Sequence, residues 1–198
     1  MRISSKKASV VVDDNLDRLG LKSVTKPTDI SVVTNLNIGT KNASFTIDMP
    51  GEYEISGVII HGVAARSHMD EEDAKTATIF TLEAADTRIA VVGHIYPELS
   101  EEQLEKIGKV DVAIVPVGNS GYTLDGQGAL EVVKKIEPKV VIPTHYADKS
   151  IKYEVAQTDL AVAIKEIGME PAETLDKYKV QPSDLADSTK LIILERQS

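Results

Sequence analysis

The chain has 198 residues and a mass of 21.4 kDa, a size that suits one domain with its own hydrophobic core. Its net charge of −9 disfavours binding to nucleic acid or to an anionic membrane, because both depend on clustered lysine and arginine. The absence of cysteine excludes disulfides and cysteine-ligated zinc. No apolar run is long enough for a signal peptide or a membrane span, so we expect a cytoplasmic protein.

Short runs rich in β-branched residues dominate the first two-thirds of the chain and predict strands. The predicted strands are Ser9–Val12, Ile30–Thr34, Ser44–Ile47, Val58–Ile60, Thr78–Leu82, Arg88–Val92 and Val112–Val117. A final strand is expected at Leu191–Leu194. The runs on either side of Glu83–Thr87 have the arrangement of a β-hairpin.

Three helices are predicted from their capping residues and their hydrophobic spacing. The first begins with the capping box Ser100–Gln103 and ends at Gly108, and the second follows Asp125, its expected N-cap, with apolar residues from Ala129 to Ile136. The third spans Leu160–Ile167. No repeat or linker interrupts the chain, so residues 1–198 are expected to form a single domain.

Histidine supplies the candidate metal ligands. His61 lies inside the apolar run "VIIHGV" and suits a structural role, whereas His68, His94 and His145 follow or end apolar strands. His145 also ends a strand-helix-strand unit, the position where functional side chains of α/β sheets tend to lie. No local zinc, serine-nucleophile or nucleotide-binding motif accompanies these residues.

Nearly the whole chain resembles the metallo-β-lactamase superfamily, specifically its small cytoplasmic Zn-dependent hydrolases. The resemblance is carried by "KASVVVDDN", "TDISVVTNLNIGT", "PGEYEISGV", "VVGHIYPELSEEQLEKIGKVDVAIVPVG", "GYTLDGQGALEVVKKIEPKVVIPTHY" and "STKLIILE". It implies an α/β fold, a four-layer αββα sandwich with a two-metal site at one edge. The usual opening strand with its Gly-His segment is missing, so we expect a sandwich that is shortened at the N-terminus.

The ligand positions depart from the family pattern. Where the family has T-H-x-H-x-D-H, this chain has Asn35, Asn37, Gly39 and Thr40 at the four ligand positions. The family's bridging aspartate matches His94, and the two ligands that remain match His68 and His145.

Three functional hypotheses follow from this departure. A two-zinc site needs about seven anionic or imidazole donors. Amide oxygens suit calcium better than zinc, so this chain lacks the ligands for two zinc ions. The first hypothesis is therefore a non-hydrolytic member that binds a small molecule or a protein. It needs no cofactor, and the missing opening strand favours a homo-oligomer because it exposes a sheet edge. The alternative is a hydrolase of esters, amides or phosphoesters with one zinc held by His68, His94 and His145. A purely structural subunit of a larger assembly is a third option.

Three other features have simpler expected roles. The acidic run Asp70–Asp73 is expected to be a solvated loop. Tyr122 and Asp125 are expected to shape the turn before the second helix. Tyr146 has either a structural role or a place in the cleft beside His145.

Overall fold

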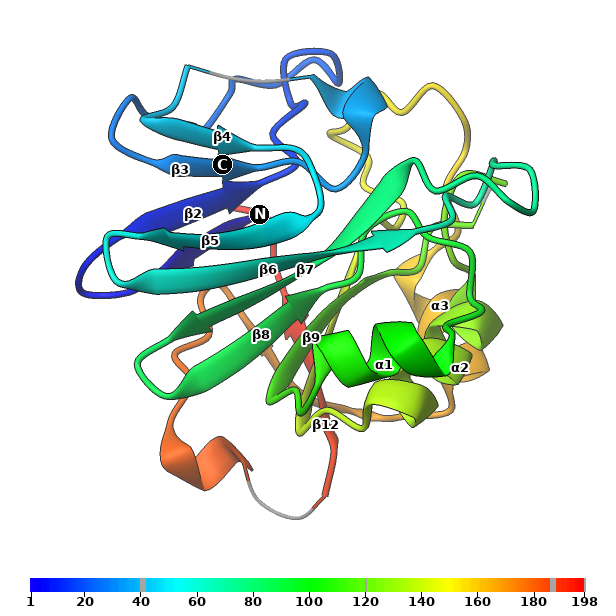
Figure 1. Cartoon of the computed structure of the whole chain (residues 1–198). Coiled ribbons are helices and arrows are strands. Elements are labelled where there is room, and N and C mark those ends of the chain that lie inside the picture. Colours follow the sequence, from blue (N-terminus) through cyan, green and yellow to red (C-terminus); the bar gives the residue numbers. More distant parts are fainter. Residues whose placement is uncertain (40–41, 120, 186–187, 198) are drawn as a thin grey trace.

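The computed structural model describes residues 1–39, 42–119, 121–185 and 188–197. Two β-sheets form a sandwich, and three α-helices pack against the larger sheet (Figure 1). The predicted α/β sandwich is therefore confirmed. Among the described residues, none of the helices has both the length and the hydrophobicity of a transmembrane span.

The smaller sheet is built from the first part of the chain and has the strand order β1-β2-β3-β4. Its strands are β1 (Arg2–Ser4), β2 (Ser9–Val12), β3 (Ile30–Val32) and β4 (Phe45–Ile47). Strands β2, β3 and β4 are parallel, so the segments that follow β2 and β3 leave the sheet at the same edge.

The larger sheet has the strand order β11-β12-β10-β9-β8-β7-β6-β5. Its strands are β5 (Gly51–Ile55), β6 (Val58–Ala65), β7 (Ala77–Ala84), β8 (Thr87–Val91), β9 (Val112–Pro116), β10 (Val140–Thr144), β11 (Pro171–Leu175) and β12 (Lys190–Leu194). Strands β8, β9 and β10 are parallel neighbours. Their carboxyl ends, which carry His94 and His145, therefore lie at one edge.

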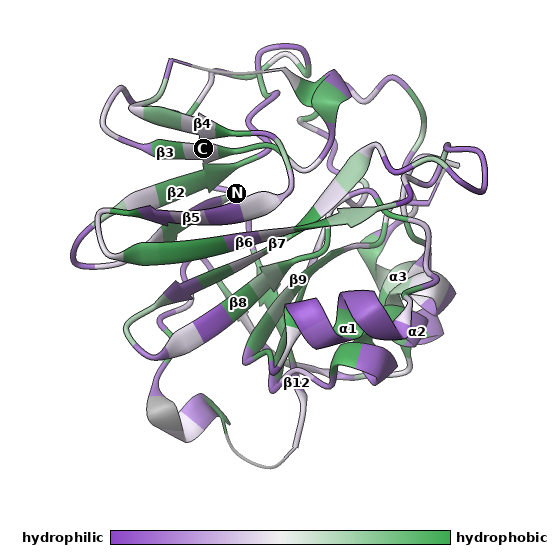
Figure 2. Cartoon of the chain, in the orientation of Figure 1, coloured by the Kyte–Doolittle hydropathy of each residue, from purple (hydrophilic) through white to green (hydrophobic). Residues whose placement is uncertain are grey.

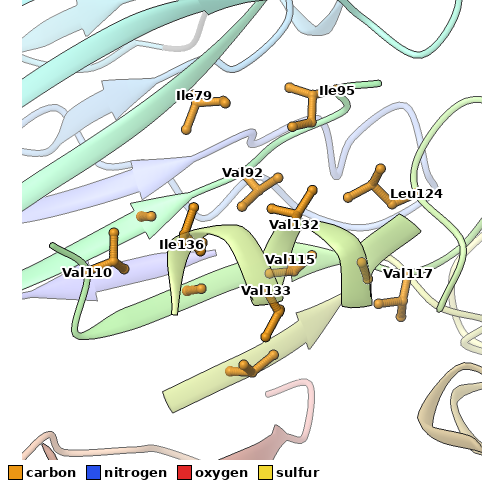
Figure 3. Close-up of a cluster of buried hydrophobic side chains, with 14 of the residues drawn as sticks. Ile79, Val92, Ile95, Val110, Val115, Val117, Leu124, Val132, Val133 and Ile136 are labelled. Atoms are coloured by element: carbon orange, nitrogen blue, oxygen red, sulfur yellow. The ribbon is translucent and has the colours of Figure 1, made fainter. Parts of the chain in front are cut away.

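The larger sheet is covered on both faces by separate hydrophobic clusters. Val12, Val32, Ile60, Phe80 and Ile114 belong to the cluster between the two sheets. The other cluster lies between the larger sheet and the helices, where α2 contributes Val132, Val133 and Ile136 (Figure 3). Hydrophobic residues accordingly line the central strands, while the exposed side of α1 is hydrophilic (Figure 2).

The capping residues predicted from the sequence begin the first two helices. The helices are α1 (Glu101–Ile107), α2 (Gly126–Ile136) and α3 (Leu160–Ile167), and short 3₁₀ helices span Leu36–Ile38 (η1) and Pro182–Leu185 (η2). Ser100 and Gln103 form the capping box of α1, and the Asp125 carboxylate accepts a hydrogen bond from the Gly128 N–H at 2.7 Å. The capping predictions for α1 and α2 are therefore confirmed.

Three strands were not predicted from the hydrophobic runs of the sequence, and all of them lie at sheet edges. β1 borders the smaller sheet, while β5 and β11 border the larger one. In β5, exposed glutamates alternate with half-buried residues, and four of the five residues of β11 are exposed. Edge strands have less side-chain surface to bury than central strands, so they lack the apolar runs on which the prediction depended.

The predicted hairpin is confirmed, and its turn contains a strained alanine. Strands β7 and β8 pair up to Ala84 and Thr87, leaving Ala85 at φ 51° and Asp86 at φ 60°. Two positive φ angles in a two-residue loop define a type I′ turn, which favours asparagine or glycine. Replacing Ala85 with asparagine should therefore raise the free energy of unfolding by about 1 kcal/mol, measured by urea denaturation.

Ala85→Val is the opposing variant for this test. A β-branched side chain fits poorly at positive φ, so this variant should be less stable than the wild-type protein. If both substitutions change stability in the same direction, the turn does not have this conformation.

Candidate functional site

The carboxyl ends of strands from both sheets meet at one edge of the sandwich. Asp13 follows β2, and Thr34 follows β3. The Asp13 carboxylate accepts hydrogen bonds from the Thr34 N–H at 2.8 Å and from its hydroxyl at 2.7 Å. Burial raises the pKa of Asp13, although these two hydrogen bonds oppose the shift. Neither residue was predicted from the sequence to be part of the site.

A glycine lets the two sheets approach each other closely beside this carboxylate. Gly93 follows β8 with φ 69°, and a β-carbon at this position would lie 2.6 Å from the Thr34 Cβ. Only glycine therefore fits at this position without displacing Thr34. This contact sets the end of the smaller sheet against the histidine segment of the larger sheet.

His94 and His145 form a pair at this edge. Their ring centroids are 4.8 Å apart, and the rings are perpendicular. Burial lowers the pKa of His94 to about 4, while burial and the neighbouring His94 lower the pKa of His145 to about 4. Both imidazoles are therefore neutral near pH 7.

The hydrogen bonds of Gln157 define the protonated nitrogen of His145. The Gln157 amide N–H donates to the Val155 carbonyl at 2.9 Å, so its Oε1 faces the His145 Nδ1 at 3.1 Å. A carbonyl oxygen only accepts, which places the proton of neutral His145 on Nδ1 and leaves the lone pair on Nε2. The Tyr153 ring also packs against His145, with the ring centroids 5.4 Å apart.

The third candidate, His68, lies on the loop after β6 and is joined to the His94 segment through the backbone. Its N–H donates to the His94 carbonyl at 3.0 Å. The next residues do not form a simple solvated loop, because the Asp70 carboxylate accepts hydrogen bonds from the N–H groups of Ser67 and Thr76 and from the Thr76 hydroxyl. Only Glu71, Glu72 and Asp73 are exposed as expected for the acidic run.

The Asn35 side chain has a structural role. Its Oδ1 accepts from the Asn37 N–H at 2.9 Å and caps η1, while its Nδ2 donates to the Ser67 hydroxyl at 3.3 Å. Asn37 is exposed, and Gly39 ends η1 with φ 78°. Thr40, the fourth predicted ligand position, lies outside the described residues.

The described side chains do not have the arrangement of a metal centre. Among these residues, no three of the histidine, aspartate or glutamate side chains are placed to hold an ion. The Asn35 amide, which matches a ligand position, is already used in hydrogen bonds to the chain itself. The donor set therefore does not fit a two-zinc centre. The Nδ1 atoms of His68 and His94 are nevertheless buried and have no hydrogen-bond partner among the described residues.

The remaining sequence candidates lie outside this cluster or stabilise the fold. His61 is half-buried on β6, 3.8 Å from the Glu52 carboxylate, as expected for a structural or surface residue. The Tyr146 hydroxyl donates to the Leu194 carbonyl at 3.1 Å, and its ring packs on the helix-side cluster. The backbone N–H of Tyr122 donates to the Asn119 carbonyl within the turn before α2.

Comparison with known families agrees with this architecture. A family profile described as "Beta-lactamase superfamily domain" matches residues 2–145. The chain belongs to the metallo-β-lactamase superfamily. A solved structure from Thermotoga maritima, assigned to the same superfamily, covers 98% of this chain and 94% of its own length with a TM-score of 0.76 and 24% identity. The metallo-β-lactamase fold implied by the sequence resemblance is therefore confirmed.

Two sequence relatives and a further solved structure match the chain over different lengths. A "UPF0173 metal-dependent hydrolase" from Enterococcus faecalis is 28% identical over 127 residues, which are 62% of this chain and 49% of the relative. The match thus spans about half of that protein. A UPF0173 protein from Pyrococcus furiosus is 24% identical over 80% of this chain and 78% of its own length. A metallo hydrolase from Ignicoccus hospitalis has a TM-score of 0.58 at 18% identity, covering 98% of this chain and 90% of its own.

Proposed function

We propose that this member of the superfamily is not a two-zinc hydrolase and uses the metallo-β-lactamase fold to bind a small molecule or a protein. The observation that carries the proposal is the Asn35 carboxamide, which occupies a ligand position but is held by hydrogen bonds to Asn37 and Ser67. An amide is a weak ligand for zinc, and breaking these bonds to reach a metal would leave buried polar groups unpaired. Relatives named as metal-dependent hydrolases favour some metal binding, which makes metal content the decisive measurement.

The test is elemental analysis of protein purified without chelators and without a nickel column. We expect well below one zinc per chain, and no hydrolysis of p-nitrophenyl acetate or bis(p-nitrophenyl) phosphate above the rate in buffer. Two zinc ions per chain together with hydrolysis would refute the proposal.

A second candidate function, the one-zinc hydrolase, is favoured by the buried and unpartnered Nδ1 atoms of His68 and His94. A buried nitrogen without a partner is costly, and a metal ion would supply one. This function predicts about one zinc per chain that is lost in His94→Ala and kept in His61→Ala. The same elemental analysis therefore separates the two functions, and His61→Ala controls for the loss of an imidazole elsewhere.

A further inference from the structure

Strand β4 is an unpaired border of the smaller sheet (Figure 1). The Ile47 carbonyl accepts from the Val33 N–H at 2.9 Å, so Ile47 directs its backbone groups toward β3. Because backbone groups alternate in direction along a strand, the N–H and C=O of Thr46 point away from the sheet. Neither group has a partner among the described residues, which leaves β4 open to pairing with another strand.

The other three sheet edges carry residues that oppose such pairing. Charged side chains and proline commonly protect the edge of a sheet. The protecting residues here are Arg2 on β1, Glu52 and Glu54 on β5, and Pro171 and Glu173 on β11. Strand β4 has the sequence Phe-Thr-Ile and contains neither a charge nor a proline. Among the four sheet edges of the described chain, β4 is therefore the one best suited to pairing.

Apolar side chains of this edge are exposed to solvent. Phe45 is 56% exposed, and Met49, which follows the strand, is 62% exposed. Alternation along the strand puts Phe45 on the same side as Ile47, which is buried in the cluster between the two sheets. Phe45 therefore continues the apolar layer of the sandwich past its last strand, where more than half of the side chain meets water.

The absence of charge at β4 fits a second copy of this chain as the partner. A two-fold contact sets an edge strand against the same strand of another molecule, so a charged edge such as β5 repels its own copy. The net charge of −9 also makes two copies repel each other at long range. Residues 42–47 contain no charged side chain, so two copies can approach there with little repulsion.

We propose that two copies of the chain associate through β4, with the two strands antiparallel about a two-fold axis at Thr46. The N–H and C=O of each Thr46 then bond to those of its counterpart, and Phe45 lies opposite Ile47 of the second copy. The two four-stranded sheets become one sheet of eight strands. Because β4 has only three residues, the contact is small, and we expect a reversible dimer with a Kd of about 10–100 µM.

Sedimentation velocity measures this association between about 5 µM and about 500 µM protein. We expect the average mass to rise from the 21.4 kDa of one chain toward twice that value. Thr46→Lys should weaken the association at least about tenfold, because it places two ammonium groups opposite each other at the axis. Thr46 is exposed, so a lysine there should leave the fold unchanged, which far-UV circular dichroism checks.

Thr174→Lys is the matched control for the lysine variant. It makes the same change of charge at an exposed residue of β11, an edge that the proposed dimer does not use, and it should associate as the wild-type protein does. A wild-type protein that stays monomeric up to about 500 µM would overturn the proposal. Equal association of Thr46→Lys and Thr174→Lys would overturn it as well.

A cysteine at the axis tests the pairing register without relying on the lysine variant. The chain has no cysteine, so Thr46→Cys supplies a single thiol. Directly opposed residues of a hydrogen-bonded antiparallel pair have Cα atoms about 5.5 Å apart, which suits a disulfide. Diamide, which oxidises two thiols to a disulfide, should cross-link Thr46→Cys at least about tenfold faster than Thr174→Cys, as seen on a non-reducing gel. Equal rates for the two variants would refute the axis at Thr46.

Discussion

Replacing Gly118 with alanine should lower the free energy of unfolding by about 3 kcal/mol or more. A β-carbon at residue 118 would lie 2.0 Å from the His145 carbonyl oxygen and 2.2 Å from the Gln157 Oε1. One of these neighbours is backbone and cannot move without displacing the end of β10. The substitution should therefore also break the hydrogen bond between His145 and Gln157, and urea denaturation with far-UV circular dichroism measures the loss of stability.

Gly121→Ala is the matched control for this substitution. Gly121 belongs to the same connection between β9 and α2 and has φ 73°, but a β-carbon there would have nothing within 4 Å. Its only cost is the left-handed backbone, about 1 kcal/mol. Equal destabilisation by the two variants would show that the contact of Gly118 with His145 is not the cause.

The strands that carry the histidines were predictable because they are central. β9 and β10 are buried on both faces and appear in the sequence as runs rich in valine and isoleucine. Once they are recognised as parallel neighbours, the position of His145 at the carboxyl edge follows from the topology alone. The edge strands β5 and β11 lack such hydrophobic runs, because many of their residues are exposed to solvent and need not be apolar.

The partners of the histidines could not be predicted in the same way. Gln157 lies in a connection without periodicity, and its pairing with His145 arises only when the chain packs against Gly118. Asp13 offered a detectable signal, because it directly follows the buried strand β2 and acidic residues at strand ends often belong to sites. Its bonds to Thr34 nevertheless depend on the parallel pairing of β2 with β3, which the sequence does not specify.

Lowering the pH from about 7 to about 4.5 should destabilise the fold by about 5 kcal/mol through His94 and His145 together. The folded chain keeps both rings neutral, since the pKa of each is lowered to about 4, whereas a histidine in the unfolded chain has a pKa near 6.5. Between these values the unfolded state binds more protons than the folded state. Stability that is fully present above about pH 6.5 is therefore lost as the pH falls toward 4.

Asp13 opposes this loss. Burial raises the pKa of its carboxyl group, so the folded state takes up this proton at a higher pH than the unfolded state does. Protonation of Asp13 therefore favours the folded state as the pH falls through its raised value. This opposing contribution begins at the raised pKa of the folded state and not at the ordinary aspartate value, so the histidine contribution is obtained from the difference between the wild-type protein and a histidine variant.

Urea denaturation between about pH 7.5 and about pH 4.5 measures this dependence, and His94→Gln identifies its source. Removing one of the two titrating rings should reduce the slope of the unfolding free energy against pH by up to about 1.4 kcal/mol per pH unit. His61→Gln removes an imidazole from the half-buried face of β6 and is the matched control. The same slope of the unfolding free energy against pH in His94→Gln and in the wild-type protein would show that the His94 ring is not held neutral by burial.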